Sequence, residues 1–228
     1  MLVVASPNIV KVKHAEGEEE EAEYRRVIIN SVLWATFQSA RFFETVAKGQ
    51  TPDFLYIGCS DSRVCPKEMT GLSVGELFVH RNIANLVCPT NYNVNAVINY
   101  AVKALKVRHI IVCGHYNCGG VMHAFGPVKD LVLDAWISQI REVYRLHAED
   151  IDRFERIKDK RKALVRWNVY EQCRNVLKNP VVQEELANLK VHGWVFNLKN
   201  GQIIDLNVDY KKLAEELFAI KRIGRPGH

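Results

Sequence analysis

The sequence lacks several features that would place it among membrane, secreted or nucleic-acid-binding proteins. Its longest apolar runs fall far short of the roughly 20 residues that a membrane-spanning helix requires, so no membrane partner is expected. It has no cluster of lysine and arginine interleaved with aromatic residues, and its formal net charge is only +5. A nucleic acid partner is therefore not expected either.

The start of the sequence shows no secretory signal. It contains no apolar segment followed by a small-residue cleavage site, and residues 1–14 contain no arginine, which makes them a poor transit peptide. Six cysteines in 228 residues, without such a signal, indicate reduced thiols rather than a disulfide scaffold. We expect a cytoplasmic protein, or a mitochondrial matrix protein if a presequence has been removed.

Length and apolar content predict one sizeable domain. With 228 residues, of which 48% are hydrophobic, the chain can bury a full core. A run of glutamates over residues 16–23 disfavours packing through self-repulsion, and it begins or precedes the first helix. We expect an acidic, flexible N-terminal tail over residues 1–25 and a single domain over residues 26–228.

The spacing of apolar residues predicts strands that alternate with helices. Apolar runs over residues 54–59, 76–81 and 109–114 predict buried strands, and a helical pattern over residues 93–105 separates the last two. This order implies an α/β fold with a central, mostly parallel sheet flanked by helices. The other predicted elements are helices over 27–46, 131–147 and 152–177, a short helix from Pro180, a hairpin over 192–206 and a last helix from about Tyr210.

The predicted first helix carries four large aromatic residues, among them Trp34 and Phe37. A helix that faces solvent on one side does not need both. They pack either against the sheet of their own chain or against a partner subunit.

Two cysteines and a histidine follow two of the predicted strands. Cys59 follows the apolar run that begins at Phe54, and His115 ends the run from His109, with Cys118 three residues later. In open α/β sheets ligands gather at the carboxyl ends of strands, so two neighbouring strand ends can close on one ion. Thiolate and imidazole ligands select Zn²⁺, and three ligands instead of the four of a structural site predict an open metal position.

An acidic and a basic residue lie close to the first of these ligands. Asp61 and Arg63 are two residues apart, so the guanidinium can hold the carboxylate in a bidentate pair and keep it ionised. Two thiolates leave the zinc with little residual positive charge, so a water in the fourth position ionises less readily. Neighbouring groups must then assist its ionisation. The carboxylate either orients that water or becomes the fourth ligand and closes the site.

The two motifs resemble those of the β-class carbonic anhydrases. The resemblance rests on residues 59–63 (CSDSR) and 114–120 (GHYNCGG), and it extends through residues 75–85, 99–102 and 192–194. It therefore covers the chain from about the first helix to near the end. It implies a zinc lyase that reversibly hydrates CO₂ to bicarbonate and a proton, with one zinc per subunit. It also implies a homodimer, or a tetramer made of two dimers, with active sites near the dimer interface.

The resemblance also assigns roles to individual residues. Asp61 and Arg63 would orient a zinc-bound hydroxide for its attack on CO₂. The predicted zinc ligands are Cys59, His115 and Cys118, the predicted substrate-binding residues are Gln50, Phe78, Tyr100 and the backbone N–H of Gly119, and an anion site is considered at Arg81.

One part of the family pattern differs in this sequence. Some bacterial members close the zinc site with the aspartate and bind inhibitory bicarbonate through a tryptophan, an arginine and a tyrosine. The matching positions here hold Tyr56, Arg81 and Phe196, so only the arginine is retained. We therefore expect a weakened regulatory site and an Asp61 that stays off zinc near neutral pH. Arg81 itself either binds an anion or forms a structural ion pair.

Three other functions were weighed against CO₂ hydration. Hydrolysis of CS₂ or COS would use the same ligands, and a bicarbonate sensor would keep the fold without turnover. A phosphatase-type nucleophile at Cys59 would need an arginine six positions later, where this chain has Cys65. Cys65, Cys88, Cys113 and Cys173 are interpreted as ordinary core or surface residues rather than ligands.

Overall fold

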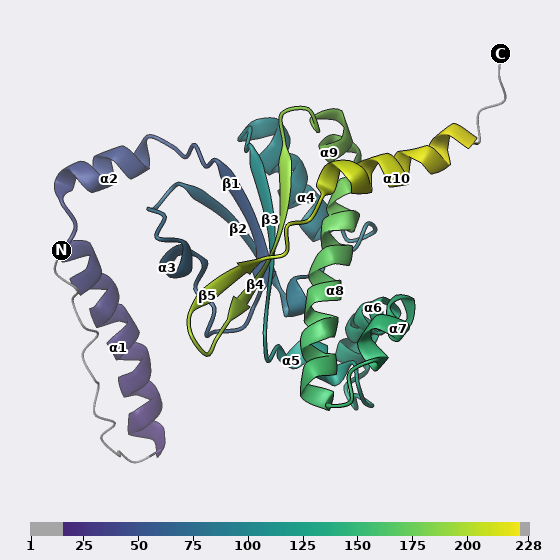
Figure 1. The fold of residues 1–228 in the computed structure, drawn as a ribbon. Helices are drawn as coiled ribbons and strands as arrows, with labels where there is room; N and C mark the ends of the chain where they lie inside the picture. Colours follow the sequence, from purple (N-terminus) through teal and green to yellow (C-terminus); the bar gives the residue numbers. More distant parts are fainter. Residues whose placement is uncertain (1–15, 224–228) are drawn as a thin grey trace. The chain divides into compact units, whose positions relative to one another are not determined.

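The computed structural model describes residues 16–223 and divides the chain into two compact units, residues 1–49 and 50–228 (Figure 1). The acidic run predicted near the N-terminus lies within the first described helix, which begins at Glu16. The first part of the predicted tail, residues 1–15, lies outside the described residues. The start of the catalytic domain at residue 26 stays a prediction.

The first unit contains two helices, α1 (Glu16–Thr36) and α2 (Ala40–Ala47). The prediction of one continuous helix over 27–46 was therefore wrong. The chain breaks at Ser39, whose backbone is extended and whose hydroxyl oxygen accepts a hydrogen bond from the backbone N–H of Phe42 at 3.1 Å. This side chain caps a new helix, which explains why the first one does not continue.

The second unit is built on a five-stranded sheet with the order β2-β1-β3-β4-β5 (Figure 1). The first four strands are parallel, and β5 is antiparallel to β4. This confirms the predicted mostly parallel sheet and its terminal hairpin. The strands are β1 (Phe54–Cys59), β2 (Leu77–Asn82), β3 (His109–His115), β4 (Lys190–Asn197) and β5 (Gln202–Asp205).

The helices of this unit follow the predicted order with one correction. The helix expected over 152–177 begins five residues later, as α8 (Ile157–Leu177), because the chain is extended at Arg156, and a short helix that was not predicted, α7 (Ala148–Asp152), precedes it. The other helices are α3 (Pro66–Thr70), α4 (Tyr92–Asn99), α5 (Gly119–His123), α6 (Leu131–Leu146), α9 (Pro180–Glu184) and α10 (Tyr210–Ile223), with the 3₁₀ turn η1 (Ile83–Asn85) and the π-helical turn η2 (Tyr100–Ala104).

Side chains alternate between the two faces of the sheet, as expected for a sheet buried on both sides. Leu55, Ile57 and Ile110 point into the main core with helices α4, α6 and α8, whereas Tyr56 and Ile111 belong to a second, smaller apolar cluster. Within residues 16–223 no helix is both long and apolar enough to cross a membrane.

Helix α8 packs directly on strands β3 and β4. Its approach is close at Gly114, where an added Cβ would lie 2.7 Å from the side chain of Val169. Two buried amides of the same helix reach the segment after β2: Asn168 donates to the carbonyl oxygen of Ala84 at 3.0 Å, and Gln172 accepts from the N–H of Val87 at 2.8 Å. Ala84 has a left-handed backbone with φ 65°, and these hydrogen bonds fix its segment against α8.

Candidate metal centre

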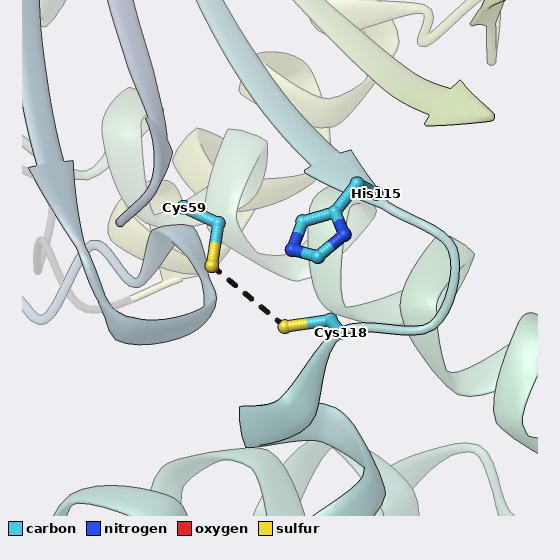
Figure 2. Close-up of side chains that lie close together, drawn as sticks. All are labelled: Cys59, His115 and Cys118. Carbon is cyan, nitrogen blue, oxygen red and sulfur yellow. Dashed lines mark hydrogen bonds between the residues drawn. The ribbon is translucent and has the colours of Figure 1, made fainter. Parts of the chain in front are cut away.

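Strands β1 and β3 bring the three predicted ligands together. Cys59 ends β1, His115 ends β3 and Cys118 directly precedes α5. Their ligand atoms all lie within 4.8 Å of one another, and all three residues are buried. Figure 2 shows the two sulfur atoms and the imidazole facing a common point. Among residues 16–223 this is the only group of three or more cysteine, histidine or acidic side chains close enough to hold a metal ion.

The geometry of these atoms fits a tetrahedral zinc ion. The two Sγ atoms are 3.8 Å apart, which is far beyond a disulfide bond. Two sulfurs at the usual Zn–S distance of about 2.3 Å and a tetrahedral angle would also be about 3.8 Å apart. The imidazole Nδ1 of His115 lies 3.0 Å from the carbonyl oxygen of Tyr116 and can donate to it. This leaves the buried Nε2, which has no hydrogen-bond partner in the described structure, as the ligand atom.

The contact between the two thiols also affects their acidity. The hydrogen bond from Cys118 lowers the pKa of Cys59, and the same contact raises the pKa of Cys118. A lowered pKa favours the thiolate, which is the form of cysteine that binds a metal ion. The other four cysteines lie outside the cluster, and the structure joins none of the six in a disulfide.

A residue with a left-handed backbone conformation lies in the loop that carries Cys118. Asn117 has φ 58°, a conformation that asparagine tolerates better than most residues. It turns the chain sharply enough for the side chain of Cys118 to meet that of His115. The sequence prediction did not include this residue, although an asparagine between two ligands is a signal for such a turn.

Asp61 and Arg63 form the predicted bidentate pair. The guanidinium donates from Nε to Oδ1 at 2.9 Å and from Nη2 to Oδ2 at 2.7 Å, and the backbone N–H of Arg63 reaches Oδ1 at 3.0 Å. These bonds hold the pKa of the Asp61 carboxyl well below its usual range. Its Oδ2 lies 3.6 Å from Nε2 of His115, so an ionised carboxylate borders the ligand cluster.

Arg81 holds this part of the chain in place. Its guanidinium donates to the backbone carbonyl oxygens of Cys59 at 2.9 Å and of Asp61 at 2.6 Å. Neither bond is the structural ion pair considered from the sequence. The arginine fixes the strand end that carries the ligand and the carboxylate, and an anion site at this position stays a prediction.

The predicted substrate residues fall into two groups. Phe78 on β2 and Tyr100 at the start of η2 have ring centroids 5.8 Å apart, so they form one aromatic surface. Gly119 directly follows Cys118 as the first residue of α5. Gln50 lies in the exposed segment before β1, and no described hydrogen bond joins it to the cluster. The substrate-binding roles of these four residues remain predictions.

Two of the three positions compared with the bacterial bicarbonate site, Tyr56 and Phe196, lie in the smaller apolar cluster. Tyr56 and Cys113 are buried, and Phe196 packs against them. Burial raises the pKa of Tyr56 above its usual range and that of Cys113 to about 12, so both side chains stay protonated and neutral. The tyrosine hydroxyl contacts the thioether of Met69 at 4.0 Å.

Comparisons with known proteins agree with this geometry. The family model described as "Carbonic anhydrase" matches residues 54–203. A carbonic anhydrase of Emericella nidulans is 51% identical over 179 residues, which cover 77% of this chain and 78% of that protein. A carbonic anhydrase of Synechococcus elongatus is 35% identical, and the match covers 72% of this chain and 64% of that protein.

Solved structures show the same fold. A tetrameric β-carbonic anhydrase of Sordaria macrospora is 38% identical, with a TM-score of 0.79, and the match covers 82% of this chain and 98% of that one. A β-carbonic anhydrase of Aspergillus fumigatus is 31% identical, with a TM-score of 0.80 and coverage of 87% and 98%. The α/β fold of this chain thus has solved relatives among the β-carbonic anhydrases.

Proposed function

Since this chain belongs to the β-carbonic anhydrase family, we propose that it catalyses the reversible hydration of CO₂ to bicarbonate and a proton, with one zinc ion per subunit. The observation that carries the proposal is the buried cluster of Cys59, His115 and Cys118 at the ends of two neighbouring parallel strands. The donor set of two thiolates and one imidazole is that of an open zinc site. When bound there, zinc supplies a Lewis acid that makes a water molecule acidic enough to act as a nucleophile at neutral pH.

Asp61 orients the nucleophile in the proposed mechanism. Its carboxylate is ionised and faces the ligand cluster, so it can accept a hydrogen bond from the attacking oxygen and direct a lone pair of that oxygen at CO₂. Arg63 binds both carboxylate oxygens, which keeps Asp61 from becoming the fourth ligand of the metal. These contacts support our prediction that Asp61 stays off zinc near neutral pH.

The surface for CO₂ is formed by apolar side chains. CO₂ has no charge to anchor, so the aromatic surface of Phe78 and Tyr100 suits it better than polar groups would. The amide of Gln50 would stabilise the charge that develops on a substrate oxygen, and the backbone N–H of Gly119 would hold bicarbonate. Arg81 is proposed as a positioning residue, because it holds the backbone of both Cys59 and Asp61.

Stopped-flow CO₂ hydration with parallel measurement of metal content tests the proposed activity. We expect the purified chain to hold about one zinc per subunit, as an open three-ligand site predicts, and to hydrate CO₂. A zinc-loaded sample that does not hydrate CO₂ would contradict the assignment. Assays with COS and CS₂ on the same sample then separate a hydrolase from a bicarbonate sensor without turnover.

We also propose that the protein resides in the cytoplasm.

We further propose that the chain assembles as a homodimer or as a tetramer of two dimers. Helices α1 and α2 expose many large apolar side chains; Phe37, for example, is 82% exposed and Trp34 49%. Edge-to-face contacts of Trp34 with Phe42 and Phe43, at 6.0 and 6.1 Å, gather several of these rings into one aromatic cluster. Exposed apolar surface of this extent marks an interface, so a second copy of the chain is the proposed partner.

Charges introduced into this aromatic cluster should break the assembly. In the double variant Trp34→Glu/Phe37→Glu, each subunit would have to bury a carboxylate in an apolar contact, which is strongly unfavourable. Light scattering coupled to size-exclusion chromatography should show the wild type as a dimer or tetramer and the variant as a smaller species. The control Tyr92→Glu changes another exposed aromatic residue, 92% exposed and in the second unit, and should keep the wild-type mass. An unchanged mass of the double variant would exclude this interface.

A further inference from the structure

A small cavity lies beside the loop that carries Cys118, on the side that faces α8. It is formed by residues 116–118, helix α5, the first turns of α8 and the turn after β4, and its volume is about 200 Å³. Helices α5 and α8 contact each other along this side (Figure 1). The volume lies below the range of about 300–1,000 Å³ that is usual for drug-sized ligands. The cavity therefore suits a small molecule or ion.

The lining of this cavity carries charge of one sign. Lys158, Arg161 and Lys162 come from α8 and Lys199 from the turn after β4, and no aspartate or glutamate lines the cavity. Among the described residues, the only acidic partner of these four cations is Asp159, whose Oδ1 lies 3.8 Å from Nζ of Lys162. Four cations around one concave site produce a strong positive potential there.

Arg161 adds an unsatisfied donor. Its Nε is buried, and it has no hydrogen-bond partner in the described structure. A buried donor on a charged group is costly when it is left unpaired, and the cost is removed when a ligand supplies an acceptor. The guanidinium group is also the side chain best suited to bind oxyanions, because its N–H groups form a planar fork.

The position of these cations on α8 is unfavourable in the absence of a ligand. The positive end of the helix dipole lies at the N-terminus of α8, where Lys158, Arg161 and Lys162 are clustered. The side chain of the N-cap residue Arg156 makes no capping hydrogen bond. An anion in the cavity would offset the repulsion among the lysines and arginine and that with the helix dipole.

We propose that this cavity binds an oxyanion of the phosphate class, either inorganic phosphate or the phosphate group of a small monoester. Four cations favour a dianion over a monoanion such as bicarbonate, because each added negative charge interacts with all of them. The binding site does not depend on the proposed CO₂ chemistry. It adjoins the metal centre, however, because Cys118 lines the cavity and the carbonyl oxygen of Asn117 lies 3.4 Å from Nη2 of Arg63.

Isothermal titration calorimetry on the full, zinc-loaded chain tests the site with two probes, inorganic phosphate and glycerol phosphate. We expect saturable binding of one anion per subunit. Arg161→Gln and Lys199→Gln should each weaken it by about 10-fold or more, since a charge-assisted hydrogen bond is lost. Both variants should keep their zinc, because neither residue is a ligand. Lys178→Gln, which removes the same charge at the opposite end of α8, should bind as the wild type does.

The outcomes separate the proposal from its alternatives. Binding of the ester as tight as that of phosphate would identify the phosphate group of a larger molecule as the ligand, and binding of phosphate alone would identify the free ion. Absence of binding for both probes would overturn the proposal. So would binding that is unchanged in Arg161→Gln and Lys199→Gln, because the anion would then occupy another site, such as the metal centre. Because Lys199 lies on an exposed turn, its variant remains informative if Arg161→Gln fails to fold.

Discussion

The Cys118→Ala variant should lose zinc and CO₂ hydration together. Cys118 is one of the two sulfur ligands of the proposed zinc site, and alanine leaves Cys59 and His115 as the remaining members of the cluster. Outer-shell partners of a zinc site already affect metal affinity by about 10–100-fold, so a lost first ligand should cost more than about 100-fold. Metal analysis after dialysis should find far less than one zinc per subunit, and stopped-flow assays should find no activity above background.

A second cysteine variant controls for general effects of the substitution. Cys173 is also buried, but it lies in α8 outside the ligand cluster, and its sulfur contacts only the carbonyl oxygen of His192 among the described hydrogen bonds. Cys173→Ala should therefore retain zinc and most of the activity, with a modest loss of stability from the small cavity. Full zinc occupancy in Cys118→Ala would show that this residue is not a ligand.

The second large effect is expected from Asp61→Ala. This variant should keep its zinc, because the three ligands remain, yet its kcat/KM should fall by about 10²–10⁴-fold, the range found when a positioned acid–base group is removed. Stopped-flow hydration and metal analysis of the same sample separate the two properties. Wild-type turnover in Asp61→Ala would remove the proposed role of the carboxylate.

Arg63→Gln tests the same pair through its pH dependence. The hydrogen bonds from Arg63 lower the pKa of Asp61, so the wild-type carboxylate stays ionised to a lower pH than a free one. Without the guanidinium the pKa should rise toward its ordinary value of about 3.9. The fall of kcat/KM at low pH that is caused by protonation of Asp61 should therefore move to higher pH. Arg108→Gln removes another arginine–aspartate pair, with Asp53 at 2.8 Å, and should leave the profile unchanged.

The metal centre could be predicted from the sequence because its residues lie at the ends of recognisable strands. Apolar runs before Cys59 and His115 indicate buried parallel strands, and the carboxyl ends of such strands meet at one edge of the sheet. The short spacing of Asp61 and Arg63 allowed their pairing to be predicted as well. In each case the relevant contact is local, or it follows directly from the sheet topology.

The features that were not predicted depend on single residues or on distant contacts. Periodicity continues across Ser39 and Arg156, so it did not reveal the break between α1 and α2 or the start of α8 after Arg156. The two hydrogen bonds of Arg81 to backbone carbonyls depend on the exact approach of β2 to the end of β1. The cation-lined cavity joins segments that are far apart in the sequence, and no spacing rule brings Lys199 to the start of α8.

The amides that α8 directs at the segment after β2 have a consequence for the order of folding. Asn168 and Gln172 bond to residues 84 and 85 positions earlier in the chain, so these contacts form only after a long loop has closed. Contacts of such sequence separation are slow to form. We therefore expect the left-handed turn at Ala84 to become fixed only once α8 has docked on the sheet. Because a Cβ added at Gly120 of α5 would lie 3.1 Å from that of Ala84, we expect the helix that follows Cys118 to be completed at the same stage.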